Sequence, residues 1–184
     1  MYKIAVLVGS LRKESFSRKI AENVVTLFPE GYETVFVDIG NLQLYNQDYD
    51  DEDRAPEEYN IFRNKMRNID AVLFVTPEYN RTMPAVLKNA LDVGSRPYGS
   101  SVWDGKPALI ISQSPGSISG FGANHHLRQS LTFLNMPVVQ QPEVYIGDSV
   151  SLLDESGKIT DDETIQYLQS AVDAFVDLIK RYKA

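Results

Sequence analysis

Hydroxyl and cationic side chains are concentrated in the turn that follows the first apolar run of the chain, residues 4–8. An amphipathic stretch with apolar residues at helical spacing comes next, so the turn leads into the start of a helix. Unpartnered N–H groups and the helix dipole favour an anion there, and this helix opens on Arg18-Lys19 rather than on acidic residues. A phosphate site is one interpretation, and an ordinary polar connection capped by Ser17 is the other. The candidate ligands are Ser10, Arg12, Ser15 and Ser17.

A second polar cluster, Pro77-Glu78-Tyr79-Asn80, comes directly after another apolar run at 71–75. An aromatic ring, an amide and exposed backbone N–H groups just past a buried strand are suited to hold a flat heteroaromatic ring. Taken alone, such a motif is more often a proline-containing turn with a half-buried tyrosine. The motif therefore predicts a ring site only if other residues converge on it.

A third segment, residues 114–122, follows the apolar run 108–111 and is rich enough in Gly and Ser to be a loop. It is not a nucleophile elbow, because Ile118 stands where G-x-S-x-G needs serine. The first turn also lacks the glycine patterns of Rossmann dinucleotide folds and P-loop NTPases. We assign no catalytic nucleophile, acid or base.

Two features could suggest a metal, and neither has the required spacing. His125 and His126 are the only histidines, and adjacent helical residues diverge by about 100°, so they do not form a chelating pair. The acidic segment 48–53 resembles the start of an EF-hand loop but has Asp53 where glycine is needed and Tyr59 where glutamate is needed. We predict a solvated acidic loop and no metal site.

The bulk properties indicate an ordinary globular chain. The 184 residues are 43% hydrophobic and 23% charged, and we expect one domain over residues 1–184. The absence of cysteine excludes thiol catalysis and disulfides and predicts a cytoplasmic protein. A net charge of −7 argues against nucleic acid as a partner, and the lack of a long apolar run argues against a membrane.

Apolar runs and amphipathic stretches alternate along the whole chain. We expect strands at 4–8, 32–39, 71–75, 108–111 and 138–144. Helices are expected between them, including one capped by Thr82, one at about 123–134, and a last one opening on a capping box at Thr160. The alternation predicts a flavodoxin-like three-layer α/β sandwich, a five-stranded parallel sheet of order 2-1-3-4-5 with helices on both faces. The loops after strands 1, 3 and 4 would then meet at one site.

The motifs together resemble the NAD(P)H-dependent FMN reductase family, and quinone, azo-dye and chromate reductases are its most similar members. The resemblance covers about residues 3–143. It is carried by residues 9–17, 44–48, 77–80, 84–92 and 126–129.

The resemblance implies a bound FMN, with each of the three loops contacting a different part of it. Ser10, Arg12, Ser15, Phe16 and Ser17 would hold the phosphate; Pro77, Glu78, Tyr79 and Asn80 would line the isoalloxazine ring; Ser114 and Gly116 would complete the pocket. Hydride would pass from NADPH or NADH through FMN to a small-molecule acceptor such as a quinone, azo compound, free flavin or chromate. The residues do not distinguish NADPH from NADH.

The family also implies self-association as a dimer or tetramer. The candidate interface pieces are the helix after residue 84 with residues 96–98, and the helix of residues 125–128 with Glu143. Arg128 and Glu143 would form either an ion pair across subunits or an ordinary surface pair.

The chain departs from the family pattern at a few positions, and two other functions stay open. Glu14 and Ser17 stand where the family often has Gly and Asn, and residues 81–83 are variable. A flavodoxin-type electron carrier would use the same fold but more typically a Ser/Thr-Gly-Thr phosphate loop. A non-catalytic binding protein would carry no flavin.

Overall fold

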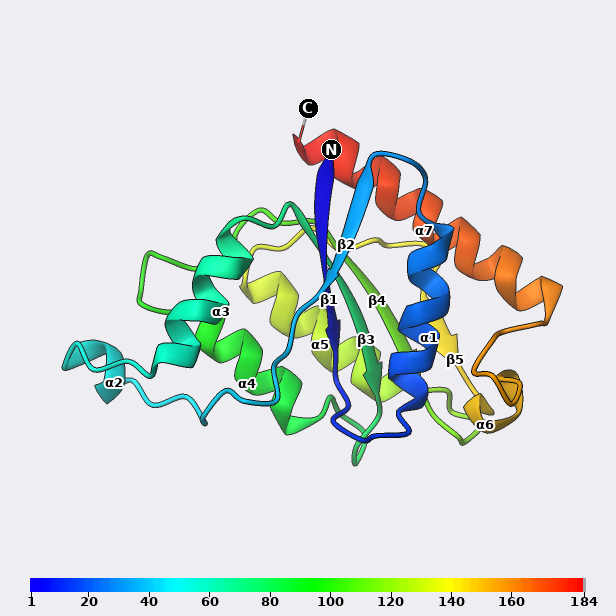
Figure 1. The fold of residues 1–184 in the computed structure, drawn as a ribbon, viewed down its shortest axis with the longest axis horizontal. Helices are drawn as coiled ribbons and strands as arrows, with labels where there is room; N and C mark the ends of the chain where they lie inside the picture. Colours follow the sequence, from blue (N-terminus) through cyan, green and yellow to red (C-terminus); the bar gives the residue numbers. More distant parts are fainter. Residues whose placement is uncertain (184) are drawn as a thin grey trace.

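The computed structural model describes residues 1–183, and its centre is a five-stranded parallel sheet of order β2-β1-β3-β4-β5 (Figure 1). Most of the strands are aliphatic or β-branched runs, the composition that suits burial on both faces. Their bounds are β1 Tyr2–Val8, β2 Tyr32–Phe36, β3 Ala71–Pro77, β4 Ala108–Gln113 and β5 Val144–Ile146. The predicted strand order and fold class are confirmed.

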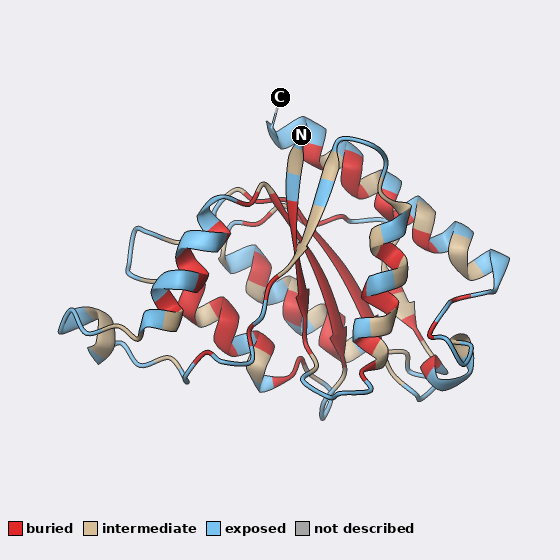
Figure 2. Ribbon diagram, in the orientation of Figure 1, coloured by how far each residue is buried: buried red, intermediate tan, exposed pale blue. Residues whose placement is uncertain are grey.

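Helices cover both faces of the sheet and enclose two apolar clusters (Figures 1 and 2). One face packs against α1 Phe16–Val24, continued by the 3-10 turn η1 Val25–Leu27, and against α7 Asp162–Lys183. The other face packs against α3 Glu57–Arg67, α4 Ala85–Gly94 and α5 Phe121–Phe133. Among residues 1–183, no helix is long and apolar enough to cross a membrane.

Several predicted element boundaries are wrong, each for a local reason. The fifth strand begins at Val144 rather than at 138, because Pro142 cannot donate to a strand ladder; Val138 makes only an isolated bridge to Ala108. The second strand ends at Phe36, three residues earlier than expected. Helix α4 starts after Pro84, so Thr82 is not its cap.

The helix α7 has its side-chain cap one residue later than predicted. The carboxylate of Asp161 accepts hydrogen bonds from the Thr164 N–H at 2.8 Å and from the Thr164 hydroxyl at 2.6 Å. These bonds lower the pKa of Asp161, because they stabilise its charged form. Asp161, and not Thr160, therefore supplies the cap.

The acidic segment is only partly the solvated loop that we expected. Residues Asp48–Asp51 form the short helix α2. Asp50 turns inward, and its two carboxylate oxygens accept hydrogen bonds from the Arg63 guanidinium at 2.7 and 2.8 Å. Both side chains are buried, so the segment is tied to α3 by a buried ion pair. No group of three metal-ligating side chains occurs within residues 1–183.

Candidate functional site

The loops after β1, β3 and β4 come together at the carboxyl edge of the sheet, the lower edge in Figure 1. The Gly9 N–H donates to the Val75 carbonyl at 2.9 Å, and the Glu78 N–H donates to the Gln113 carbonyl at 3.2 Å. A Cβ at Gly9 would lie 2.6 Å from the hydroxyl of Thr76, so only glycine allows the first loop to pass this close to β3. The predicted convergence of the three loops is confirmed in the fold.

The start of α1 has the features of an anion site. The Ser15 hydroxyl caps the helix and accepts from the Arg18 N–H at 3.1 Å. Among the described residues, the N–H groups of Phe16 and Ser17 have no acceptor, and the first turn carries no acidic side chain. Ser10 and the exposed Arg12 lie in the loop just before it, where the Arg12 N–H donates to the Ser10 hydroxyl at 3.4 Å.

Ser17 has a second role that its position in the sequence does not reveal. Its side chain is fully buried, and its hydroxyl accepts a hydrogen bond from the Gln113 amide at 2.9 Å. This bond joins α1 to the end of β4. Ser17 therefore fixes the relative position of two of the three loops and is not the cap of α1, which is Ser15.

The segment after β3 is a tight two-residue hairpin turn. The Tyr79 N–H donates to the Thr82 carbonyl at 2.9 Å, and the Thr82 N–H donates back to the Tyr79 carbonyl at 3.0 Å. The two central residues, Asn80 and Arg81, have φ of 49° and 66°, the left-handed conformation that such turns require. The turn exposes Asn80 and about half of the Tyr79 side chain at the edge of the sheet, whereas Pro77 is buried as the last residue of β3.

The carboxylate of Glu78 points away from the tip of this turn and caps α5. Its Oε2 accepts from the Ala123 N–H at 3.1 Å, and its Oε1 accepts from the Arg81 guanidinium at 3.0 Å. Helix α5 begins after Gly120, which offers no side-chain cap, so a carboxylate from the segment after β3 stabilises its positive end. The side chain of Glu78 is 6% exposed.

The loop after β4 adds polar groups beside the other two. The Ser114 hydroxyl accepts from the Gly116 N–H at 3.1 Å, and Gly116 is exposed. Beneath this loop, the side-chain oxygen of Gln113 is buried with no hydrogen-bond partner among the described residues. A buried acceptor of this kind at the junction of three loops suits a ligand that brings hydroxyl donors.

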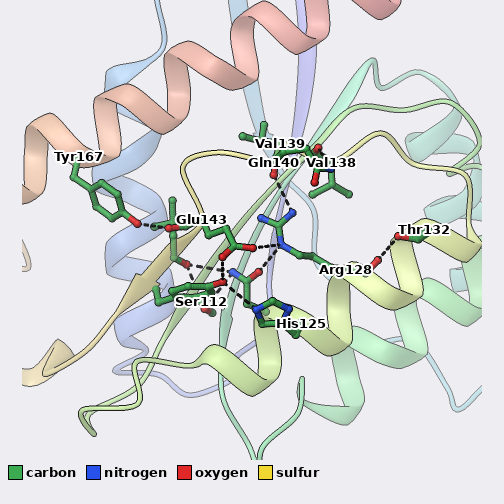
Figure 3. A network of polar contacts seen from close by, with 12 residues as sticks. Ser112, His125, Arg128, Thr132, Val138, Val139, Gln140, Glu143 and Tyr167 are labelled. Carbon is green, nitrogen blue, oxygen red and sulfur yellow. Dashed lines mark hydrogen bonds and ion pairs between the residues drawn. The ribbon is translucent and has the colours of Figure 1, made fainter.

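The two histidines diverge, as predicted. His125 Nε2 is 3.1 Å from the Tyr145 hydroxyl, and His126 Nδ1 is 2.9 Å from the Thr82 hydroxyl. Figure 3 shows His125 beside a network in which Arg128 extends from α5 toward Glu143. Burial and the hydrogen bond to Glu143 raise the pKa of Tyr145, so its hydroxyl stays a donor.

The pair Arg128–Glu143 forms within one chain. The Arg128 Nε is 3.7 Å from the nearer Glu143 oxygen, and the Arg128 side chain also donates to the Asn124 amide and the Val139 carbonyl (Figure 3). The side chains of Arg128 and Glu143 are 15% and 31% exposed, so this is not a free surface pair. The network joins α5 to the segment that leads into β5.

A family profile, sequence relatives and solved structures all resemble this chain. Residues 2–151 match the sequence profile described as NADPH-dependent FMN reductase. The chain is 53% identical over 184 residues to a quinone reductase of Pseudomonas putida, across 100% of this chain and 98% of that protein. The chain belongs to the NADPH-dependent FMN reductase family.

Two further relatives match nearly the whole chain. A 2-hydroxy-1,4-benzoquinone reductase of a Burkholderia species is 46% identical over 178 residues, 97% of this chain and 96% of that one. The solved structure of FerB, a flavoenzyme NAD(P)H:(acceptor) oxidoreductase from Paracoccus denitrificans, matches with a TM-score of 0.91 and 38% identity over 99% of each chain. The protein is therefore an oxidoreductase, and its cofactor is FMN.

The residues at the three loops fit this cofactor. A phosphate needs donors and no nearby carboxylate, and the start of α1 offers two N–H groups without acceptors among residues 1–183 and no acidic residue in its first turn. A ribityl chain brings hydroxyl donors, and the partnerless Gln113 oxygen is an acceptor. The exposed turn at Tyr79-Asn80 leaves room for a planar ring at the edge of the sheet.

Two residues of the site, Thr76 and Gln113, were missed by the sequence analysis: Thr76 approaches Gly9, and Gln113 holds Ser17. Glu78 was expected at the ring, but its carboxylate accepts from α5. A polar residue at the end of an otherwise apolar strand is the signal for Thr76 and Gln113, because the strands reach the edge where ligands bind. No sequence signal pairs Glu78 with a backbone group on α5.

Proposed function

We propose that the protein is an NAD(P)H:quinone oxidoreductase that uses FMN. When bound, FMN supplies the chemistry, accepting a hydride from NAD(P)H and passing reducing equivalents to the acceptor. The names of the two most similar relatives described above support a quinone as the acceptor. Azo compounds, free flavin and chromate are other acceptors of the same proposed site.

The single observation that carries this proposal is the anion site at the start of α1. We propose that the N–H groups of Phe16 and Ser17, the hydroxyls of Ser10 and Ser15, and the guanidinium of Arg12 hold the phosphate of FMN. Ser17 contributes its backbone, because its hydroxyl already accepts from Gln113. We further propose that residues 1–184 act as one FMN-binding domain.

The ring would lie against the turn after β3 and the loop after β4. In this arrangement Pro77, Tyr79 and Asn80 provide the surface and the edge contacts, and Ser114 and Gly116 close the other side. Glu78 orients the turn by holding α5 and does not contact the acceptor. No side chain in these loops is needed as a nucleophile or general base, so this chain's contribution is to bind, orient and exclude water.

We propose that a second copy of the chain covers the groove between α4 and α5. The groove has a volume of about 940 Å³ and runs from Tyr79 and Asn80 to Phe133, whose side chain is 86% exposed. An exposed phenylalanine in a groove beside the site favours a homodimer interface, or one interface of a tetramer. The lack of cysteine fits a cytoplasmic location.

The deciding experiment uses the purified full chain. We expect a yellow protein with FMN as the extracted flavin, and steady oxidation of NADH or NADPH when a benzoquinone is added. A protein that binds FMN but consumes NAD(P)H only with a separate reductase is an electron carrier, and a colourless protein that takes up no FMN is a binding protein. Light scattering on the same sample measures the oligomeric state.

A further inference from the structure

A second pocket, of about 440 Å³, lies beside the phosphate loop, between the start of α1 and the end of the edge strand β2. Its apolar floor comes from the ends of β1 and β2, and its rim carries Arg12, Arg18 and Asp38. It shares Ser10 and Arg12 with the candidate phosphate loop, so the two sites are continuous. The proposed FMN contacts do not use Arg18, Asp38 or the floor.

Arg18 has donors to spare in this pocket, whereas the guanidinium of Arg12 is the one that we assign to the phosphate of FMN. Among the described residues, the Arg12 guanidinium has no hydrogen-bond or ion-pair partner. The Arg18 guanidinium lies 3.7 Å from the centre of the Phe36 ring, and its Nε donates to Glu22 at 2.7 Å. The two terminal nitrogens of Arg18 have no partner within residues 1–183. Stacking on Phe36 therefore holds a flat cation at the pocket with its terminal donors uncommitted.

The carboxylate of Asp38 stands in the same pocket without an ion pair. One of its oxygens accepts from the Gly40 N–H at 2.8 Å, and no arginine nitrogen within the described part of the chain lies within 4 Å of it. Asp38 is exposed and follows the strand that neighbours β1. In Rossmann dinucleotide folds, a carboxylate at this point of the sheet accepts from the ribose 2′-hydroxyl of NAD, whereas an arginine beside it holds the ribose 2′-phosphate of NADP.

We propose that this pocket binds the adenosine end of NAD(P)H. The apolar floor takes the base, and Arg18 binds the 2′-phosphate of NADPH, a group that the carboxylate of Asp38 faces. Arg18 brings two uncommitted terminal nitrogens to that phosphate, so the pocket favours NADPH over NADH. This inference rests on the proposed function, because it names the subsite for the electron donor of that reaction.

Binding of adenosine 2′,5′-bisphosphate to the FMN-loaded protein, measured by titration calorimetry, tests the pocket without any turnover. Arg18→Ala should weaken this binding roughly 10-fold, the effect of removing one charge-assisted contact. Asp38→Asn should strengthen it several-fold, because it removes a negative charge facing a phosphate. Glu22→Gln is the matched control: it breaks the same ion pair but keeps the guanidinium, and we expect unchanged affinity.

The two variants are expected to change the affinity in opposite directions. A folding defect would instead weaken binding in both variants. If Arg18→Ala does not fold, the direction of the Asp38→Asn change decides alone. The proposal is overturned if the wild type does not bind adenosine 2′,5′-bisphosphate, if Arg18→Ala binds it as tightly as the wild type, or if Asp38→Asn weakens it.

Kinetics with a shortened donor provide an independent test. Arg18→Ala should raise the KM for NADPH about 10-fold and leave the KM for reduced nicotinamide mononucleotide, which has no adenosine, unchanged. An equal rise for both donors would refute the assignment. Failure of the proposed function is recognised separately, because it would appear as missing flavin absorbance or as no oxidation of either donor by the wild type.

Discussion

Removing the carboxylate of Glu78 should destabilise the protein more than its surface position suggests. The side chain is 6% exposed and its carboxylate accepts from the Ala123 N–H and the Arg81 guanidinium. Glu78→Ala leaves the Ala123 N–H at the start of α5 without its acceptor. A hydrogen bond to a charged group contributes about 1.5–3 kcal/mol. The Arg81 pair contributes at most about 1 kcal/mol, because the Arg81 side chain is 67% exposed.

We therefore expect Glu78→Ala to lower the free energy of unfolding by about 3 kcal/mol. Glu78→Gln keeps an acceptor and loses the charge, so it should cost about 1 kcal/mol, the scale of a charge–dipole interaction at a helix end. Arg81→Ala is the matched control, because it breaks the ion pair and leaves the cap intact. It should cost less than about 1 kcal/mol.

Urea unfolding of the FMN-free protein measures these three values, with the fluorescence of Trp103 as the probe. Trp103 is the only tryptophan and is fully buried, so its emission reports loss of the core. The reasoning is refuted if Arg81→Ala costs as much as Glu78→Ala, since the ion pair and not the cap would then be the stabilising contact. A loss below about 1 kcal/mol for Glu78→Ala would also refute it.

Three further predictions concern other parts of the molecule. Arg12→Ala should weaken FMN binding by about 1.5–3 kcal/mol through loss of a charge-assisted contact to phosphate, and flavin fluorescence titration would show an unchanged Kd if Arg12 lies outside that site. Asp50→Asn should lower the free energy of unfolding by about 3–5 kcal/mol, because Arg63 is left charged and buried; a urea transition close to that of the wild type would contradict this. Burial lowers the pKa of Lys106 to about 8. Between pH 8 and 9.5 the unfolded chain thus binds a proton that the folded chain lacks, and stability should rise by roughly 1 kcal/mol per pH unit. Lys106→Met should flatten this slope in urea unfolding at the two pH values, and a slope that persists in the variant would exclude Lys106 as its source.

Strand order and the meeting of three loops were predictable because each depends on local patterns. Continuous apolar runs mark buried parallel strands, and alternation with amphipathic stretches leaves few possible topologies. The boundaries of strands and helices were less predictable where a proline or a turn interrupts the apolar or amphipathic pattern. Pro142 delays β5, and the turn that begins at Tyr79 delays the start of α4.

Contacts across long sequence separations were not predictable from pattern. Asp50 appeared to belong to a solvated acidic segment, and only the folded chain places it on Arg63, where both are buried. Glu78 appeared to belong to the ring site, and the fold turns its carboxylate to a backbone N–H 45 residues later. In each case the residue type predicts a polar contact. The identity of the partner depends on how α3 or α5 packs against the sheet.

The polar groups at the site divide into those that hold the scaffold and those left free for ligands. Ser17 and Gln113 join α1 to β4 through their side chains, and Glu78, in the segment after β3, accepts a hydrogen bond from α5. Around them, the guanidinium of Arg12 and the N–H groups of Phe16 and Ser17 have no partner among residues 1–183. Because the first set already fixes the loops, binding a cofactor does not have to order them, and little of the binding free energy is lost to conformational entropy. This preorganisation explains how a site without a catalytic triad can depend on position alone: the chain supplies fixed donors, and the bound flavin supplies the reactivity.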